Sequence, residues 1–216
     1  MRTITITKTI CSYDELSDKA KERAYNEIIG RYSSFESELR SDEYRETLKE
    51  MESVFHIKVY NWEVEGEGRY NFRFDFTNYR WGSYCCDYED EPRMLVRYLN
   101  NEIFPMINGK YYGKCIRRED GTYDHKKRYS KIRMENCGCL LTGTYTDRAF
   151  DNAVYKAYEF VRKGYTIRDY VLDTLEDFFS DWGRDLDYAY SEEFVLDTID
   201  SLGLEFYEDG TIYGES

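Results

Sequence analysis

The chain has 216 residues, 41% of them hydrophobic and 18% aromatic, and its 43 Asp and Glu against 30 Lys and Arg give a net charge of −13. This composition allows a sizeable buried core and excludes an intrinsically disordered chain. No apolar run reaches the roughly 18 residues of a membrane span, and the N-terminus lacks the apolar region of a signal peptide, so we expect no membrane partner. With two prolines and no linker, we expect one compact domain over residues 1–216.

The first elements are predicted to be a strand and a helix. Ile and Thr alternate over residues 2–8, which indicates a half-buried strand. Ser12 and Glu15 then have the spacing of a capping box, and Ser17 is a second possible N-cap. Gly30 marks a possible end of this helix.

A second helix and a β-hairpin are predicted next. Residues 35–54 carry many charges and one apolar stripe that includes Leu39 and Leu48, which is typical of a surface helix. Residues 56–82 predict a hairpin with one packed and one solvated face, because polar and apolar residues alternate on both sides of the segment EGEG. In the first strand Val59, Asn61 and Glu63 alternate with Tyr60, Trp62 and Val64, and in the second Phe72, Phe74 and Phe76 alternate with Arg73 and Asp75.

The middle of the chain predicts a short helix followed by strands. Pro92 suits the first position of a helix that continues to Phe104. Residues 108–147 are basic, rich in tyrosine and interrupted by glycine, and residues 131–146 are the best candidates there for a strand pair.

The C-terminal part predicts three helices and a strand. The first helix ends before Gly164, and one of its faces is lined by Ala149, Ala153, Ala157 and Phe160. Thr166 and Asp169 mark the start of the second helix. Its predicted buried stripe consists of Val171, Leu175, Phe178 and Trp182. A last helix over 191–202 ends at Gly203, and residues 204–213 predict a strand with an Asp-Gly turn. Strands at the beginning, middle and end among segregated helices indicate an α+β fold.

Two stretches of the chain resemble a large set of small acidic proteins encoded by bacteriophages and prophages, most of which have no assigned activity. The matching residues are Tyr13, Asp14, Glu15, Leu16, Ser17, Ala20, Lys21 and Ala24 near the start, and Glu205, Phe206, Asp209 and Gly210 near the end. The resemblance implies a phage-borne origin, the cytoplasm of a bacterial host, and interference with host processes or host immunity. It implies no catalytic residue.

No motif for catalysis, cofactor binding or metal binding stands out. The chain has two histidines and no nucleophile elbow, phosphate-binding glycine loop or dinucleotide fingerprint, so we expect no enzyme and no cofactor. The six cysteines are expected to be reduced thiols without a metal. A zinc site at Cys137 and Cys139, completed by Cys115 or His125, is the alternative.

The charge is concentrated at the C-terminal end. Residues 151–216 hold 17 Asp and Glu against 5 Lys and Arg, a net of −12, whereas residues 1–150 are nearly neutral at −1. Carboxylates recur every fourth residue from Asp169 to Asp185, about 6 Å apart along a helix, and this ladder imitates the phosphates of a nucleic-acid strand. The predicted partner-binding residues are Asp169, Asp173, Asp177, Asp181, Asp185, Asp187, Glu192 and Glu193.

The first hypothesis is therefore an inhibitor, similar to an anti-CRISPR protein, that places this acidic surface in the basic nucleic-acid channel of a host defence nuclease. In this hypothesis the protein does not bind nucleic acid itself. An alternative is a nucleic-acid-binding module at residues 110–133, where cations neutralise phosphates and tyrosines stack on bases; its candidates are Lys110, Lys114, Arg117, Arg118, Lys126, Lys127 and Arg128. An enzyme with an unrecognised site is a further alternative, and a merely solvated acidic face is the simplest account of the aspartate row.

Overall fold

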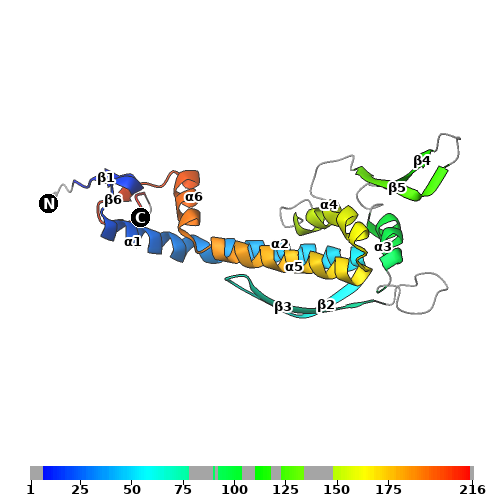
Figure 1. Ribbon diagram of the computed structural model, residues 1–216. Coiled ribbons are helices and arrows are strands. Elements are labelled where there is room, and N and C mark those ends of the chain that lie inside the picture. Colours follow the sequence, from blue (N-terminus) through cyan, green and yellow to red (C-terminus); the bar gives the residue numbers. More distant parts are fainter. Residues whose placement is uncertain are drawn as a thin grey trace. The chain divides into compact units, whose positions relative to one another are not determined.

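A computed structural model of the chain describes residues 7–77, 90, 92–103, 110–117, 123–133 and 148–214. Its helices and antiparallel strand pairs (Figure 1) confirm the predicted α+β class. The chain divides into two compact units, the first from residues 1–42 and 184–216 and the second from residues 43–183. Each unit is described by itself below. Within the described ranges, no helix has the length and apolar character that crossing a bilayer requires.

The first unit joins segments from both ends of the chain. Strand β1 (Ile10–Cys11) pairs antiparallel with β6 (Phe206–Tyr207), and helices α1 (Asp18–Ile28) and α6 (Glu192–Leu202) pack beside them. The predicted strand over residues 2–8 lies mostly outside the described residues, and residues 7–9 are not in a strand. The core of this unit consists of Leu16, Ala20, Ala24, Ile28, Phe194, Val195, Phe206 and Ile212.

The predicted caps of the first unit are confirmed. Ser12 and Glu15 form a capping box around a single 3₁₀ turn, with the Ser12 amide donating to Glu15 over 2.8 Å. The Ser17 hydroxyl accepts a hydrogen bond from the amide of Ala20 at the start of α1. Gly203 ends α6 with a φ of 60°, a left-handed conformation that favours glycine.

The helix predicted to end near Gly30 instead continues into the next one. Helix α1 ends at Ile28, but a π-helical turn (Ile29–Ser33) connects it directly to α2 (Ser34–Phe55). Gly30 keeps helical geometry because a glycine inside a helix costs only about 1 kcal/mol. Of the predicted stripe on α2, Leu48 is buried whereas Leu39 is 48% exposed.

The second unit contains the predicted hairpin, formed by β2 (Ile57–Glu65) and β3 (Arg69–Phe76). Its turn has Glu67 and Gly68 at positive φ, as in a type I′ turn. One prediction is wrong: Val59 does not share a face with Asn61 and Glu63 but is buried on the side of Trp62 and Val64. A bulge at Asn61, which has a φ of 52°, reverses the alternation within β2.

The second unit also contains helices, of which α5 (Ile167–Tyr188) packs on the hairpin through aromatic contacts. The part of α5 up to Gly183 belongs to this unit. The others are α3 (Pro92–Tyr98), followed by a π-helical turn (Leu99–Ile103), and α4 (Arg148–Lys163). The four residues of each stripe predicted for α4 and α5 are buried. Trp182 of α5 stacks on Tyr44 of α2 with ring centroids 5.2 Å apart, and Phe179 lies 4.8 Å from Phe72 of β3.

The basic middle segment forms a third strand pair. Strand β4 (Lys110–Arg117) pairs antiparallel with β5 (Tyr123–Arg133). The strand pair was predicted over residues 131–146, of which residues 134–146 lie outside the described residues. Alternation of Lys and Arg with tyrosine over 110–133 was interpreted as a binding segment, although the same pattern is typical of strands.

Candidate functional site

The aspartate row begins at a helix cap. Asp169 lies in the first turn of α5, where its carboxylate accepts hydrogen bonds from the amide and the hydroxyl of Thr166 over 2.9 and 2.8 Å. The Thr166 hydroxyl in turn accepts from the Asp169 amide. Asp169 therefore satisfies backbone groups that the helix leaves without partners.

The next three members of the row, Asp173, Asp177 and Asp181, are half-buried in the second unit. Asp177 forms an ion pair with Lys156 of α4 over 2.7 Å. Burial, and then the neighbouring Asp177, raise the pKa of Asp173 above its usual value. Steps of four residues advance by about 40° around a helix, or ~160° from the first to the fifth member, so the row cannot stay on one solvated face.

The last member of the row belongs to the first unit. Asp185 is half-buried and lies 3.4 Å from the guanidinium of Arg40, which also forms an ion pair with Glu36 over 2.5 Å. The same guanidinium lies 5.3 Å above the ring of Tyr188. Asp169, Asp177 and Asp185 thus have structural partners, and the row is not an evenly exposed ladder.

The most acidic surface of the molecule lies instead on the first unit. Its described residues, 7–42 and 184–214, hold 17 Asp and Glu against 7 Lys and Arg, a net charge of −10. Three of the predicted partner-binding residues, Asp187, Glu192 and Glu193, are exposed here. Glu192 and Glu193 occupy the first turn of α6, where carboxylates interact favourably with the helix dipole.

Glu192 lines an open groove of about 570 Å³ between α1, the turn before it, and α6. We call this the acidic groove; its residues are Tyr13, Asp14, Asp18, Lys21, Glu22, Tyr25, Glu192 and Leu196. Its four carboxylate residues are exposed, and Leu196 is 45% exposed. The hydroxyl of Tyr25 donates to the carbonyl of Tyr190 over 2.9 Å, which holds its ring at the edge of the groove.

Electrostatic interactions within the acidic groove are consistent with its excess of carboxylates. Partial burial, followed by the charge of Glu192, raises the pKa of Tyr13. The ammonium group of Lys21 lies 5.7 Å from the ring of Tyr13. Asp14, Asp18 and Glu22 were not predicted as site residues. Asp18 and Glu22 lie one turn apart on α1, but Asp14 lies in the separate 3₁₀ turn before it, so helical spacing could not have placed all three together.

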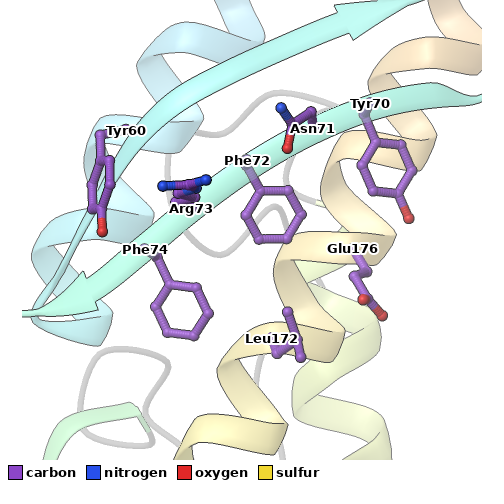
Figure 2. Close-up of a pocket in the computed structure, with 8 residues that line it drawn as sticks. All are labelled: Tyr60, Tyr70, Asn71, Phe72, Arg73, Phe74, Leu172 and Glu176. Atoms are coloured by element: carbon purple, nitrogen blue, oxygen red, sulfur yellow. The ribbon is translucent and has the colours of Figure 1, made fainter.

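A second groove, of about 480 Å³, lies in the second unit between the hairpin and α5 (Figure 2). We call it the β3 groove; its residues are Tyr60, Tyr70, Asn71, Phe72, Arg73, Phe74, Leu172 and Glu176. Tyr60, Tyr70 and Leu172 are each between 36% and 37% exposed, which is unusual for apolar groups that line one groove. Alternation of Phe72, Phe74 and Phe76 predicted the packed face of β3 but gave no indication of this groove.

The alternative nucleic-acid-binding residues are placed only by the backbone. Lys110, Lys114 and Arg117 lie on β4, and Lys126, Lys127 and Arg128 lie on β5. In the register of the pair, Lys110 is opposite Arg133 and Lys114 is opposite Tyr129. Arg118 lies outside the described residues.

The predicted zinc alternative also falls largely outside the described residues, which include neither Cys137 nor Cys139. Within the part of the chain that the structure describes, no three His, Cys, Asp or Glu side chains cluster in a way that could hold a metal ion. Cys11 is a half-buried free thiol.

Comparisons of this chain with family models, with curated proteins and with solved structures find no match.

Proposed function

We propose that this chain is a non-enzymatic binding protein whose acidic groove contacts a basic surface of another protein. The observation that carries the proposal is the grouping of four exposed carboxylate residues, two tyrosines and an exposed leucine around one concave surface. Aromatic and apolar groups supply contact area, and charges supply orientation and a fast encounter. Asp187 and Glu193 extend the same charge outside the groove.

The aspartate row has a different role in this proposal from the one predicted. Because Asp177 and Asp185 are paired with cations and Asp173 is half-buried, these groups contribute to the long-range field rather than to direct contacts. A field of one sign attracts a basic partner over about a Debye length, roughly 8 Å at physiological ionic strength.

The resemblance to phage-encoded acidic proteins supports a more specific form of the proposal. The partner would be a host defence nuclease in the bacterial cytoplasm, and its basic nucleic-acid channel would hold the acidic groove of this protein. Inhibition would then follow because this protein competes with nucleic acid for the same Lys and Arg side chains of the channel, as predicted for a surface that imitates nucleic-acid phosphates.

A charge-neutralising variant tests the groove directly. The groove variant combines Asp14→Asn, Asp18→Asn, Glu22→Gln and Glu192→Gln. The matched control removes the same number of charges from exposed positions of the same unit outside the groove, with Glu38→Gln, Asp200→Asn, Glu205→Gln and Glu208→Gln. Both variants have the same net charge, so only the position of the lost charges differs.

The measurement is capture of bacterial proteins on each immobilised variant, followed by elution with increasing salt. We expect a protein retained by the parent and by the control to leave the groove variant at lower salt, and to associate with it about tenfold more slowly at low ionic strength. Equal retention by the groove variant and the parent would refute the proposal. Equal weakening in both variants would show that net charge alone matters and would also refute it.

A further inference from the structure

The β3 groove follows the edge of a strand. Four consecutive residues of β3, from Asn71 to Phe74, line it. Because successive side chains of a strand point to opposite faces of the sheet, a groove on one face would contact only alternate residues. Contact with all four indicates that the groove runs along the edge of the strand, over ~13 Å, and Tyr60, which lies opposite Arg73 on β2, also contributes to its lining.

This edge is the side of β3 away from β2. Among the described strands β3 pairs with β2 alone, in a two-stranded sheet. Each strand of such a pair has one row of backbone N–H and C=O groups directed away from its neighbour. An extended peptide can satisfy such a row by adding a further strand, which is a common mode of peptide recognition.

The rings of β3 that line the groove, together with Leu172 of α5, form an apolar lining that the core holds in place. Phe72 and Phe74 project from β3 toward α5, where Leu172 lies (Figure 2). Phe72 stacks on Phe179, a fully buried residue of α5, and Tyr70 stacks on the same ring with centroids 6.2 Å apart. Since these contacts fix the rings, the groove needs little rearrangement to accept apolar side chains.

The charges of the groove select the kind of peptide. Glu176 lies on the α5 wall, is exposed, and forms no ion pair with the residues that the structure describes. Its neighbour Asp177 adds a second carboxylate, although one paired with Lys156. Arg73 contributes a cation from the strand itself. A Lys or Arg of an incoming strand would find its complement at Glu176, whereas a phosphate backbone would be repelled there.

We propose that the β3 groove binds an extended peptide segment of another protein, which adds to the edge of β3, places apolar side chains against Phe72 and Leu172, and directs a Lys or Arg toward Glu176. This site is separate from the acidic groove and does not depend on its function. A small compound would leave most of the strand edge unpaired, so the length of the edge favours a peptide.

The test uses synthetic nine-residue peptides, capped at both ends, that alternate Val or Leu with Thr and carry one central Lys. Affinity is measured by calorimetry with the full chain, and backbone amide exchange is measured over residues 71–74. We expect binding, slower exchange of these amides, and preference for the Lys peptide over one with a central Glu. N-methylation of alternate peptide nitrogens on one edge should weaken binding about tenfold or more, whereas the same change on the other edge should not.

Two variants and their controls test the side chains. Leu172→Asp should weaken binding about tenfold, and Glu176→Lys should reverse the preference between Lys and Glu peptides by two- to fivefold in each direction. Leu39→Asp and Glu38→Lys make the same changes at exposed positions of α2 in the first unit and should have no effect. Circular dichroism verifies that each variant is folded.

Several results would overturn the inference. One is a lack of binding by all peptides of the series. Another is equal weakening by N-methylation on either edge, because a strand pairs through only one of them. Binding of a single-stranded oligonucleotide in place of the peptides, lost in Leu172→Asp, would assign the groove to nucleic acid instead.

Discussion

Gly210 and Ala20 come from stretches near the two ends of the chain, and the two residues meet in the first unit. A Cβ atom at Gly210 would collide with the backbone carbonyl of Ala20, and Gly210 also has a φ of +85°. Leu16, Ala20 and Phe206 of the same stretches are buried in one core. These buried residues therefore stabilise the fold of the first unit, whereas Tyr13, Asp14 and Lys21 of the same stretches line the acidic groove.

Gly210→Ala should destabilise the first unit by more than about 2 kcal/mol, because both the left-handed conformation and the collision oppose a side chain. Gly203→Ala is the matched control: Gly203 also has positive φ, but nothing lies within 4 Å of its added Cβ, so a loss of about 1 kcal/mol is expected. Chemical denaturation measures both. Similar losses in the two variants would contradict the close contact with Ala20.

Tyr170 and Tyr98 are both fully buried, but their hydroxyl groups differ. The Tyr98 hydroxyl donates to the carbonyl of Phe55 over 3.3 Å, whereas the Tyr170 hydroxyl has no hydrogen-bond partner among the described residues. Burial raises the pKa of both phenols. Tyr170→Phe should keep or increase the free energy of unfolding, while Tyr98→Phe should lower it by about 1 kcal/mol. Thermal unfolding of both variants measures these changes. A marked loss of stability in Tyr170→Phe would contradict the absence of a hydrogen-bond partner for the Tyr170 hydroxyl among the described residues.

At the scale of elements, some carboxylates stabilise α5 and others destabilise it. Asp169 caps the helix and Asp177 pairs with Lys156. Asp173 has neither advantage, because it is half-buried and lies one turn from Asp177. The aspartates in this row therefore have separate roles, because the row turns gradually around the helix axis toward the packed interior.

Asp173→Asn should increase the free energy of unfolding at pH 7 by a few tenths of a kcal/mol. The pKa of Asp173 is raised in the folded state, so ionisation costs stability above that pKa. This cost should disappear as the pH falls through the folded pKa to below the unfolded value of about 3.9. Asp177→Asn, which loses the contact with Lys156, should not stabilise. Denaturant titrations at several pH values test both; a stabilisation by Asp173→Asn that stays constant at low pH would contradict the assignment.

At the scale of the whole molecule, the proposed binding depends on the distribution of charge. The described part of the first unit carries a net charge of −10 in a chain of net charge −13. Such a surface repels phosphate and attracts basic proteins, and salt screens both effects.

Binding of a basic partner should therefore weaken steadily as salt rises from about 50 to 500 mM, and free duplex or single-stranded DNA should not bind at physiological salt. Fluorescence anisotropy with labelled DNA and with the captured partner measures the two. Tight DNA binding at physiological salt would instead favour the basic segment 110–133 as the functional surface.

Local features of the sequence were sufficient to predict the fold class and many element ends. Ser17, Gly164 and the pair Thr166 and Asp169 mark helix ends because caps act over three or four residues. The buried stripes of α4 and α5 follow from helical periodicity alone. Each of these features depends on neighbours within about one turn, which the sequence contains directly.

Only the tertiary structure decided which groups face solvent and which surfaces are concave. The bulge at Asn61 reversed the faces of β2, and Lys156 and Arg40 form ion pairs with Asp177 and Asp185 that the spacing of the aspartates did not indicate. Both grooves combine segments that are distant in the sequence, α1 with α6 and β3 with α5. The exposure of a side chain depends on what the rest of the chain packs against it, and spacing along one element cannot supply that information.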